Sequence, residues 1–147
     1  MKRLAIAFVL VSACSAKPKP TGAGDGSGSG PAIYAKKIAL SWGIQTTSDG
    51  ADLFLQTTDE TGKQVSHPLG HYLGKCQVFT PAKEMDAVTG IGCDSGGTGI
   101  ELHAVVRGDD IIVVKLNTKQ GVTPDPMARE EVTRVTAPIG AKIEAGT

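Results

Sequence analysis

The strongest constraint on the fold is an alternating segment near the middle of the chain, residues 100–117. Apolar residues occupy every second position from Ile100 to Val106, and the sequence Gly-Asp-Asp at 108–110 separates this stretch from a second apolar stretch. Because side chains alternate between the two faces of a strand, the pattern predicts a β-hairpin with a half-buried first strand. His103 falls on the polar parity of that strand, so we expect it to be solvated. The unbroken apolar run at 111–114 predicts a central strand covered on both faces.

Shorter segments of the same kind lie on both sides of this hairpin. Residues 37–57 predict a second hairpin, because alternate apolar positions continue across the turn sequence at 48–51. Residues 75–80 predict a short strand, and residues 130–136 and 141–145 predict closing strands. The 19 glycines favour short elements joined by many turns. Together these features predict an all-β fold of seven or eight strands, a small antiparallel sandwich or barrel.

Three segments do not fit a strand. Proline and glycines break the alternation over residues 67–74, which predicts an irregular loop. Residues 82–88 are too short for a stable helix and predict one helical turn or a bend. The sequence Asp125-Pro126 is typical of a helix start, so residues 126–132 have two interpretations, a short helix or the start of a strand.

The N-terminus has the features of an export signal. Lys2 and Arg3 make it basic, and residues 4–11 form an unbroken apolar run. A membrane-spanning helix needs about 20 apolar residues, so this run is too short to span a bilayer. Residues 1–13 therefore predict a signal peptide that is cleaved.

The residues that end this segment resemble a bacterial lipobox. The sequence Val-Ser-Ala at 11–13 precedes Cys14, and a linker rich in glycine, serine and proline follows Cys14. The resemblance covers only the first 15 residues. It implies that Cys14 carries a diacylglyceryl thioether and that two or three acyl chains anchor the protein stably in a bacterial membrane. The alternative is that Cys14 is only a small apolar residue at the end of the signal peptide.

The same resemblance implies a location outside the cytoplasm, in the periplasm or at the cell surface. Ser15 after the lipid site favours the outer membrane. Residues 14–32 contain five glycines and three prolines but no large apolar side chain, so they predict a flexible tether. The remaining residues, 33–147, form the predicted β-rich domain.

The sequence contains three cysteines. With Cys14 assigned to lipid, Cys76 and Cys93 remain, and an even pair in an exported protein predicts a disulfide. Two buried free thiols or a metal site are the alternatives. Neither cysteine lies in a C-x-x-C sequence, which disfavours the metal.

Composition excludes some functions and leaves others open. Lys and Arg together equal Asp and Glu at 15 each, and no nucleotide-binding motif is present, so we expect no nucleic-acid partner. We predict no cofactor and no catalysis. The preferred interpretation is a binding or structural domain whose partner is an envelope protein or a cell-wall component.

Two alternatives involve histidines. Residues 93–97, Cys-Asp-Ser-Gly-Gly, resemble the nucleophile segment of trypsin-like serine proteases, which implies a hydrolase with Ser95 as nucleophile, His67 or His71 as base and Asp86 as acid. A domain of about 115 residues is only half of what that fold requires. Alternatively, His67 and His71 bind a metal or small ligand, although their four-residue spacing suits a helix and the proline and glycine between them disfavour one.

Overall fold

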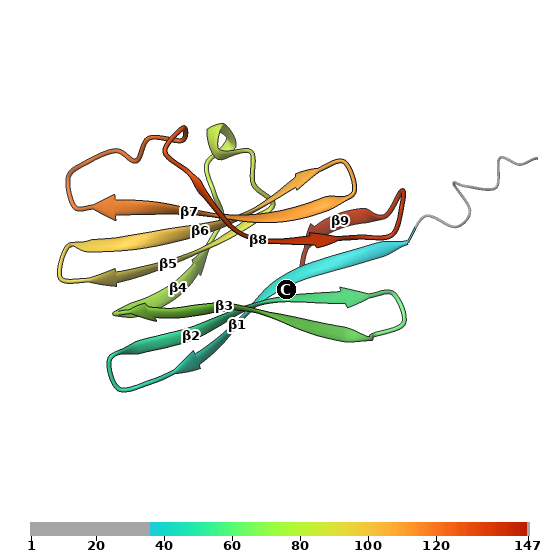
Figure 1. Ribbon diagram of the computed structural model, residues 1–147, viewed down its shortest axis with the longest axis horizontal. Helices are drawn as coiled ribbons and strands as arrows, with labels where there is room; N and C mark the ends of the chain where they lie inside the picture. Colours follow the sequence, from blue (N-terminus) through green and yellow to red (C-terminus); the bar gives the residue numbers. More distant parts are fainter. Residues whose placement is uncertain (1–35, 147) are drawn as a thin grey trace, which may run out of the picture. The chain divides into compact units, whose positions relative to one another are not determined.

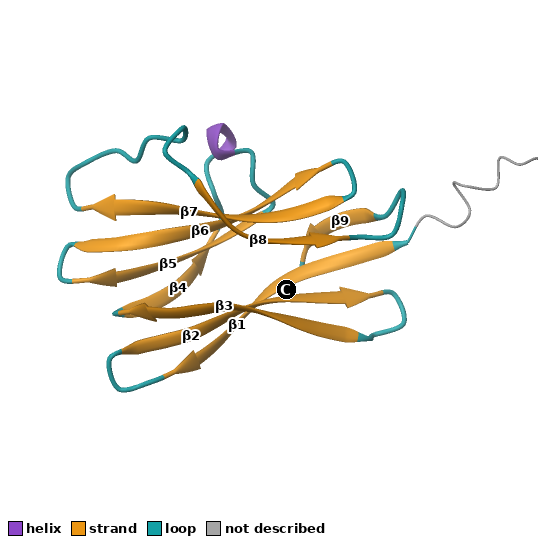
Figure 2. Ribbon diagram, viewed as in Figure 1, coloured by secondary structure: helices purple, strands orange, loops and turns teal. Residues whose placement is uncertain are grey.

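Nine β-strands and one short 3-10 helix make up residues 36–146, the part of the chain that the computed structural model describes (Figures 1 and 2). The predicted signal peptide (residues 1–13), the lipid site Cys14 and the tether up to residue 32 lie outside the described residues. In chain order the elements are β1 (Lys37–Thr46), β2 (Gly50–Asp59), β3 (Gln64–Leu73), β4 (Lys75–Phe79), η3 (Lys83–Met85), β5 (Thr89–Ser95), β6 (Thr98–Arg107), β7 (Asp110–Lys119), β8 (Glu130–Thr136) and β9 (Lys142–Ala145).

The strands form two sheets that pack face to face. One has four strands in the order β3-β2-β1-β9, and the other has five in the order β4-β5-β6-β7-β8. Neither sheet closes on itself, so the fold is a sandwich and not a barrel. The predicted hairpins β1–β2 and β6–β7 are confirmed, and every neighbouring pair is antiparallel except β1 and β9, which are parallel.

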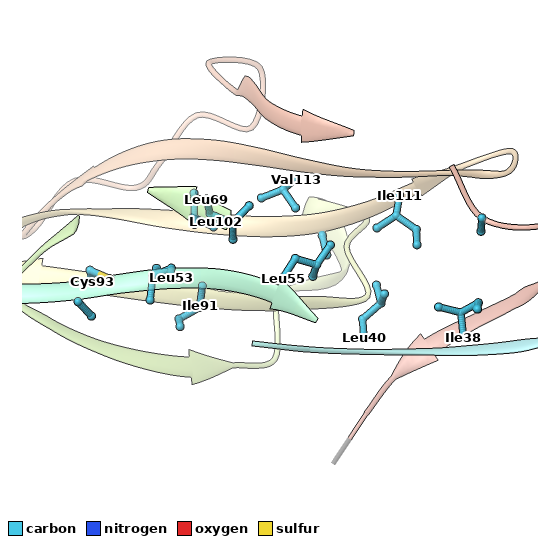
Figure 3. Close-up of a cluster of buried hydrophobic side chains, with 13 residues drawn as sticks. Ile38, Leu40, Leu53, Leu55, Leu69, Ile91, Cys93, Leu102, Ile111 and Val113 are labelled. Atoms are coloured by element: carbon cyan, nitrogen blue, oxygen red, sulfur yellow. The ribbon is translucent and has the colours of Figure 1, made fainter. Parts of the chain in front are cut away.

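Inward-facing apolar side chains fill the space between the sheets (Figure 3). Leu40 and Leu53 from one sheet and Ile91, Leu102 and Val113 from the other are at most 1% exposed. Burying each such side chain contributes roughly 1.5–3 kcal/mol. The alternation in the sequence correctly predicts which parity of β1 and β6 faces this core.

The predicted irregular loop at residues 67–74 is wrong, because β3 continues through most of it. Pro68 and Gly70 pair with consecutive residues of β2, which leaves Leu69 as the extra residue of a β-bulge. Proline and a bulge are tolerated here because β3 lies at the edge of its sheet, where a missing N–H removes no ladder bond. The bulge directs Leu69 into the core, where it is buried.

Gly74 carries the chain from one sheet to the other. Its φ of 91° lies in the left-handed region, and a Cβ there would lie 2.0 Å from the carbonyl oxygen of Asp94. Its N–H donates to the carbonyl of Asp49 at 2.9 Å. Only glycine satisfies both the backbone conformation and this close approach.

The strand that sequence reasoning missed is β5. Its sequence alternates glycine with larger residues, and glycine is a weak strand former. The glycines face outward and make room for a side chain of the neighbouring strand: a Cβ on Gly90 would lie 2.8 Å from the ring of Phe79.

A second buried layer covers the outer face of the five-stranded sheet. His103, Val105 and Leu116 are at most 3% exposed, yet they lie outside the core cluster between the sheets. The β4–β5 connection, which contains η3, and the β7–β8 connection lie over this face (Figure 1). The two connections are joined by a hydrogen bond from Arg129 Nη1 to the carbonyl of Met85 at 2.9 Å.

The expectation that His103 is solvated is therefore wrong. The ring of Phe79 packs edge-on against the imidazole, with ring centroids 5.6 Å apart. His103 Nε2 donates to Glu101 Oε1 at 2.8 Å, and Nδ1 has no hydrogen-bond partner. Period-two alternation assigns a residue to a face of the sheet, but it does not tell whether a loop covers that face.

The helix predicted as one alternative for residues 126–132 does not form. The side chain of Asp125 accepts a hydrogen bond from the N–H of Met127 at 2.9 Å, as a helix cap would, but the chain only turns there. From Glu130 onward it pairs with β7 as β8, which suits the β-branched Val132, Thr133 and Val135. In the described residues the only helical segment is η3, which agrees with the single turn predicted between β4 and β5.

Cys76 and Cys93 form the predicted disulfide, which joins directly paired residues of β4 and β5. Their Cα atoms are 4.0 Å apart, and Cys93 is 3% exposed within the core. The bridge ties the edge strand β4 to the rest of its sheet. Its sequence separation of 17 corresponds to roughly 3 kcal/mol of stabilisation in the chain-entropy model.

We expect the double variant Cys76→Ala/Cys93→Ala to lose about 3 kcal/mol of unfolding free energy in urea denaturation, because its unfolded chain is no longer cross-linked. The unreduced wild-type chain, denatured and treated with an alkylating reagent, should gain no mass at either cysteine. Two alkylated thiols in that sample would contradict the disulfide.

Candidate functional site

A depression opens at the end of the sandwich where β3, β5 and β7 end, on the left of the view in Figure 1. Its volume is about 610 Å³, within the usual range for small-molecule sites. The five-stranded sheet supplies the floor, and the last residues of β3 supply a wall. The depression therefore lies where the inner faces of the two sheets separate.

Two rows of side chains cross the floor on the inner face of the five-stranded sheet. The row nearer the core contains Cys93, Ile100 and Asn117, and the row at the mouth contains Ser95, Thr98 and Lys119. The rows are about 7 Å apart, because alternate residues of a strand share a face. The disulfide and an isoleucine thus lie deep in the depression, while two hydroxyl groups and an ammonium group lie at its mouth.

The wall is formed by His71, Tyr72 and Leu73. The Tyr72 hydroxyl donates to the carbonyl of Leu69 at 2.9 Å, which fixes the ring against the floor. Burial, and to a lesser extent the carboxylate of Glu130, raise the pKa of the Tyr72 hydroxyl, so it stays protonated and uncharged. Leu73 is 57% exposed and adds apolar surface at the rim.

His71 is held between two carboxylates. Nδ1 donates to Asp52 Oδ1 at 2.9 Å, and Nε2 donates to Asp49 Oδ1 at 3.1 Å. The hydrogen bond to Asp52, and then the charges of both carboxylates, raise the pKa of His71 above its ordinary value of 6.5. Hydrogen bonds from Thr47 and His71 lower the pKa of Asp49. The clamp joins the β1–β2 turn to the edge strand β3, and it becomes an imidazolium with two carboxylates when His71 is protonated.

Two residues of the predicted serine hydrolase, His71 and Ser95, border the depression. The His71 imidazole lies on the outward face of β3, and both of its nitrogens are hydrogen-bonded to carboxylates, so neither nitrogen is placed to accept the Ser95 proton. Within residues 36–146 no hydrogen bond joins Ser95 to a histidine. The predicted acid, Asp86, lies apart from this pair: it is bound to Arg107 Nη1 at 2.8 Å, beside η3.

The structure also separates the two predicted metal-binding histidines. His67 pairs with Leu55, which faces the core, whereas His71 pairs with Asp52, which faces outward. The bulge at Leu69 changes the parity between them, so the two imidazoles lie on opposite faces of β3. His67 Nε2 instead lies 3.4 Å from Thr57 Oγ1. No cluster of three or more His, Cys, Asp or Glu side chains suited to a metal ion occurs in the described part of the chain.

Sequence reasoning missed most of the residues that line the depression. Thr98, Asn117 and Lys119 lie at strand ends, where alternation weakens, and Tyr72 lies in the segment predicted as a loop. The register of the β6–β7 hairpin could have identified the residues that form the floor of the depression. Counting back from its two-residue turn pairs Ile100 with Asn117.

Comparisons with known proteins add no family or relative. No protein-family model matches the sequence, no curated protein matches it, and no solved structure matches the fold. Among the described residues, no helix is long and apolar enough to cross a membrane. The fold and the site therefore define the class by themselves, a disulfide-bonded β-sandwich with an amphipathic depression at one end.

We expect His71→Gln to lower the melting temperature by a few degrees at pH 5.5 and by much less at pH 9. A pKa raised above 6.5 in the folded state means that the clamp stabilises fully below pH 6.5 and that its contribution is lost as His71 deprotonates at higher pH. The lowered pKa of Asp49 keeps its carboxylate charged at pH 5.5.

The matched control is His67→Gln, measured by the same thermal unfolding. Its partner Thr57 carries no charge, so the variant should show a similar change at both pH values. A pH-independent effect of His71→Gln would mean that the imidazole contributes by packing and not by charge.

Proposed function

We propose that the chain is a lipid-anchored envelope protein whose β-sandwich binds a ligand or partner without catalysing a reaction. The observation that carries this proposal is the pairing of Cys76 with Cys93 inside the sandwich. It accounts for two of the three cysteines and leaves Cys14, which follows a lipobox-like segment. A structural disulfide also supports export, because such bonds persist in oxidising compartments.

The position at which the chain enters the sandwich fits a tethered binding domain. β1 begins at Lys37 and ends at Thr46. The end at Thr46 is the one near the depression, because Thr46 pairs with Ala51 and Ala51 pairs with Tyr72 of the wall. A strand of this length spans about 30 Å. The chain therefore enters the sandwich at the end opposite the depression.

For the anchor we expect Cys14→Ser to abolish acylation and to move the protein from the membrane fraction to the soluble fraction. Metabolic labelling with a radioactive fatty acid and fractionation of the cells measure the two effects. Thr21→Ser, a conservative change in the predicted tether, is the matched control and should stay in the membrane fraction. Membrane retention of the Cys14→Ser protein would place the anchor elsewhere in the chain.

A serine hydrolase is the second candidate, because His71 and Ser95 line the same depression. We expect no labelling of the protein by a fluorophosphonate probe, since both nitrogens of His71 are hydrogen-bonded to carboxylates and neither is bonded to Ser95. A known serine protease treated in parallel provides the positive control. Labelling of the wild-type protein that disappears in Ser95→Ala would favour the hydrolase and overturn the non-catalytic proposal.

A further inference from the structure

We propose that the depression binds an unbranched aliphatic monocarboxylate of medium chain length, with the alkyl chain against the disulfide and the carboxylate at Lys119. The inference deepens the proposed binding function of the domain and does not depend on the lipid anchor. It is carried by the arrangement of the lining in two rows, of which the inner row is mainly apolar and the row at the mouth contains the cationic Lys119.

The deep part of the depression suits an alkyl chain. Cys93, Ile100 and the ring of Tyr72 surround it, and Leu73 extends the apolar surface to the rim. Most of the exposed lining is apolar. Each methylene group that enters it leaves water, which favours binding. Asn117 is the one polar side chain of the deep row, so a polar ligand would obtain few hydrogen bonds in this part of the site.

The mouth suits an anionic head group. Lys119 forms no ion pair within residues 36–146, and the hydroxyl-bearing Ser95 and Thr98 adjoin it in the same row. A carboxylate at this position would accept hydrogen bonds from the ammonium group and from the hydroxyl groups. Such charge-assisted bonds are the stronger class of hydrogen bond.

The acidic groups around the depression are bonded to other side chains or face away from it. Asp49 and Asp52 share the imidazole of His71 on the outward face of β3, and Glu130 lies 3.7 Å from the ammonium group of Lys115. Asp94 follows Cys93 in β5, so its side chain has the opposite parity and lies on the outer face of the sheet. The side chain at the mouth that remains to attract an anion is therefore Lys119.

The size of the site sets the length of the chain. A distance of about 7 Å separates the two rows, and the lysine side chain extends beyond the mouth row. Butyrate is too short to reach from the ammonium group past Ile100, whereas decanoate reaches the deep row and fills more of the 610 Å³. Affinity should therefore rise steeply from butyrate to decanoate.

The test is isothermal titration calorimetry with the full-length Cys14→Ser protein, purified without detergent, and decanoate below its micellar concentration. We expect saturable binding at one site, and binding of decanol at least tenfold weaker because decanol lacks the charge. Lys119→Gln should weaken decanoate binding by about the same tenfold and leave decanol unchanged. Lys63→Gln, at a turn at the far end of the sandwich, is the matched control and should leave both affinities unchanged.

A second variant tests the apolar part. Leu73→Ser changes an exposed side chain, so the fold should be kept, and it should weaken decanoate and decanol equally. Any of three results would overturn the inference: no saturable binding, equal affinity of the wild-type protein for decanoate and decanol, or a ratio of the two affinities that is unchanged in Lys119→Gln. None of these results bears on the anchor, which is tested separately by fractionation of the Cys14→Ser protein.

Discussion

The antiparallel register of β5, β6 and β7 determines the position of nearly every side chain discussed above. It places Ile91, Leu102 and Val113 between the sheets, and it aligns the two rows that form the floor of the depression. A shift of one residue in either pairing would exchange the inner and outer faces of a strand. Two-residue turns hold the register: Gly96 and Gly97, with φ of 66° and 92°, connect β5 to β6, and Gly108, with φ of 61°, begins the turn between β6 and β7.

Sequence patterns predict this fold where local features such as alternation determine the structure. They fail where the structure depends on the position of a strand in its sheet or on contacts between distant segments. Alternating apolar residues predict the two hairpins, and the even pair of cysteines predicts the disulfide. Both features are present in the structure. The second half of β3 was predicted as a loop because Pro68 and Gly70 normally interrupt a strand, whereas an edge position with a bulge accommodates both. The burial of His103 was missed because it depends on two connections that pack on the outer face, a contact between segments far apart in the chain.

The candidate site was less predictable than the fold for the same reason. Its wall and floor come from four strands, β3, β5, β6 and β7, and the wall strand β3 meets the other three only in the folded sandwich. The sequence did draw attention to Ser95 and His71, and the structure places both in the depression. Their assigned chemistry depended on a histidine with a free nitrogen, however, and Asp49 and Asp52 occupy both nitrogens of His71. Those carboxylates come from the β1–β2 hairpin, and no local motif connects them to the histidine.

The parallel pairing of β1 with β9 has a consequence for how the protein is made. The first and last strands of the domain are neighbours, with Lys37 opposite Lys142 and Leu40 opposite Ala145. A chain that emerges from a ribosome or a translocation channel N-terminus first lacks β9 until the end, so its four-stranded sheet is completed only after residue 145 has emerged. Contacts between residues so distant in sequence form slowly. The four-stranded sheet is therefore completed only when the last strand has joined the first.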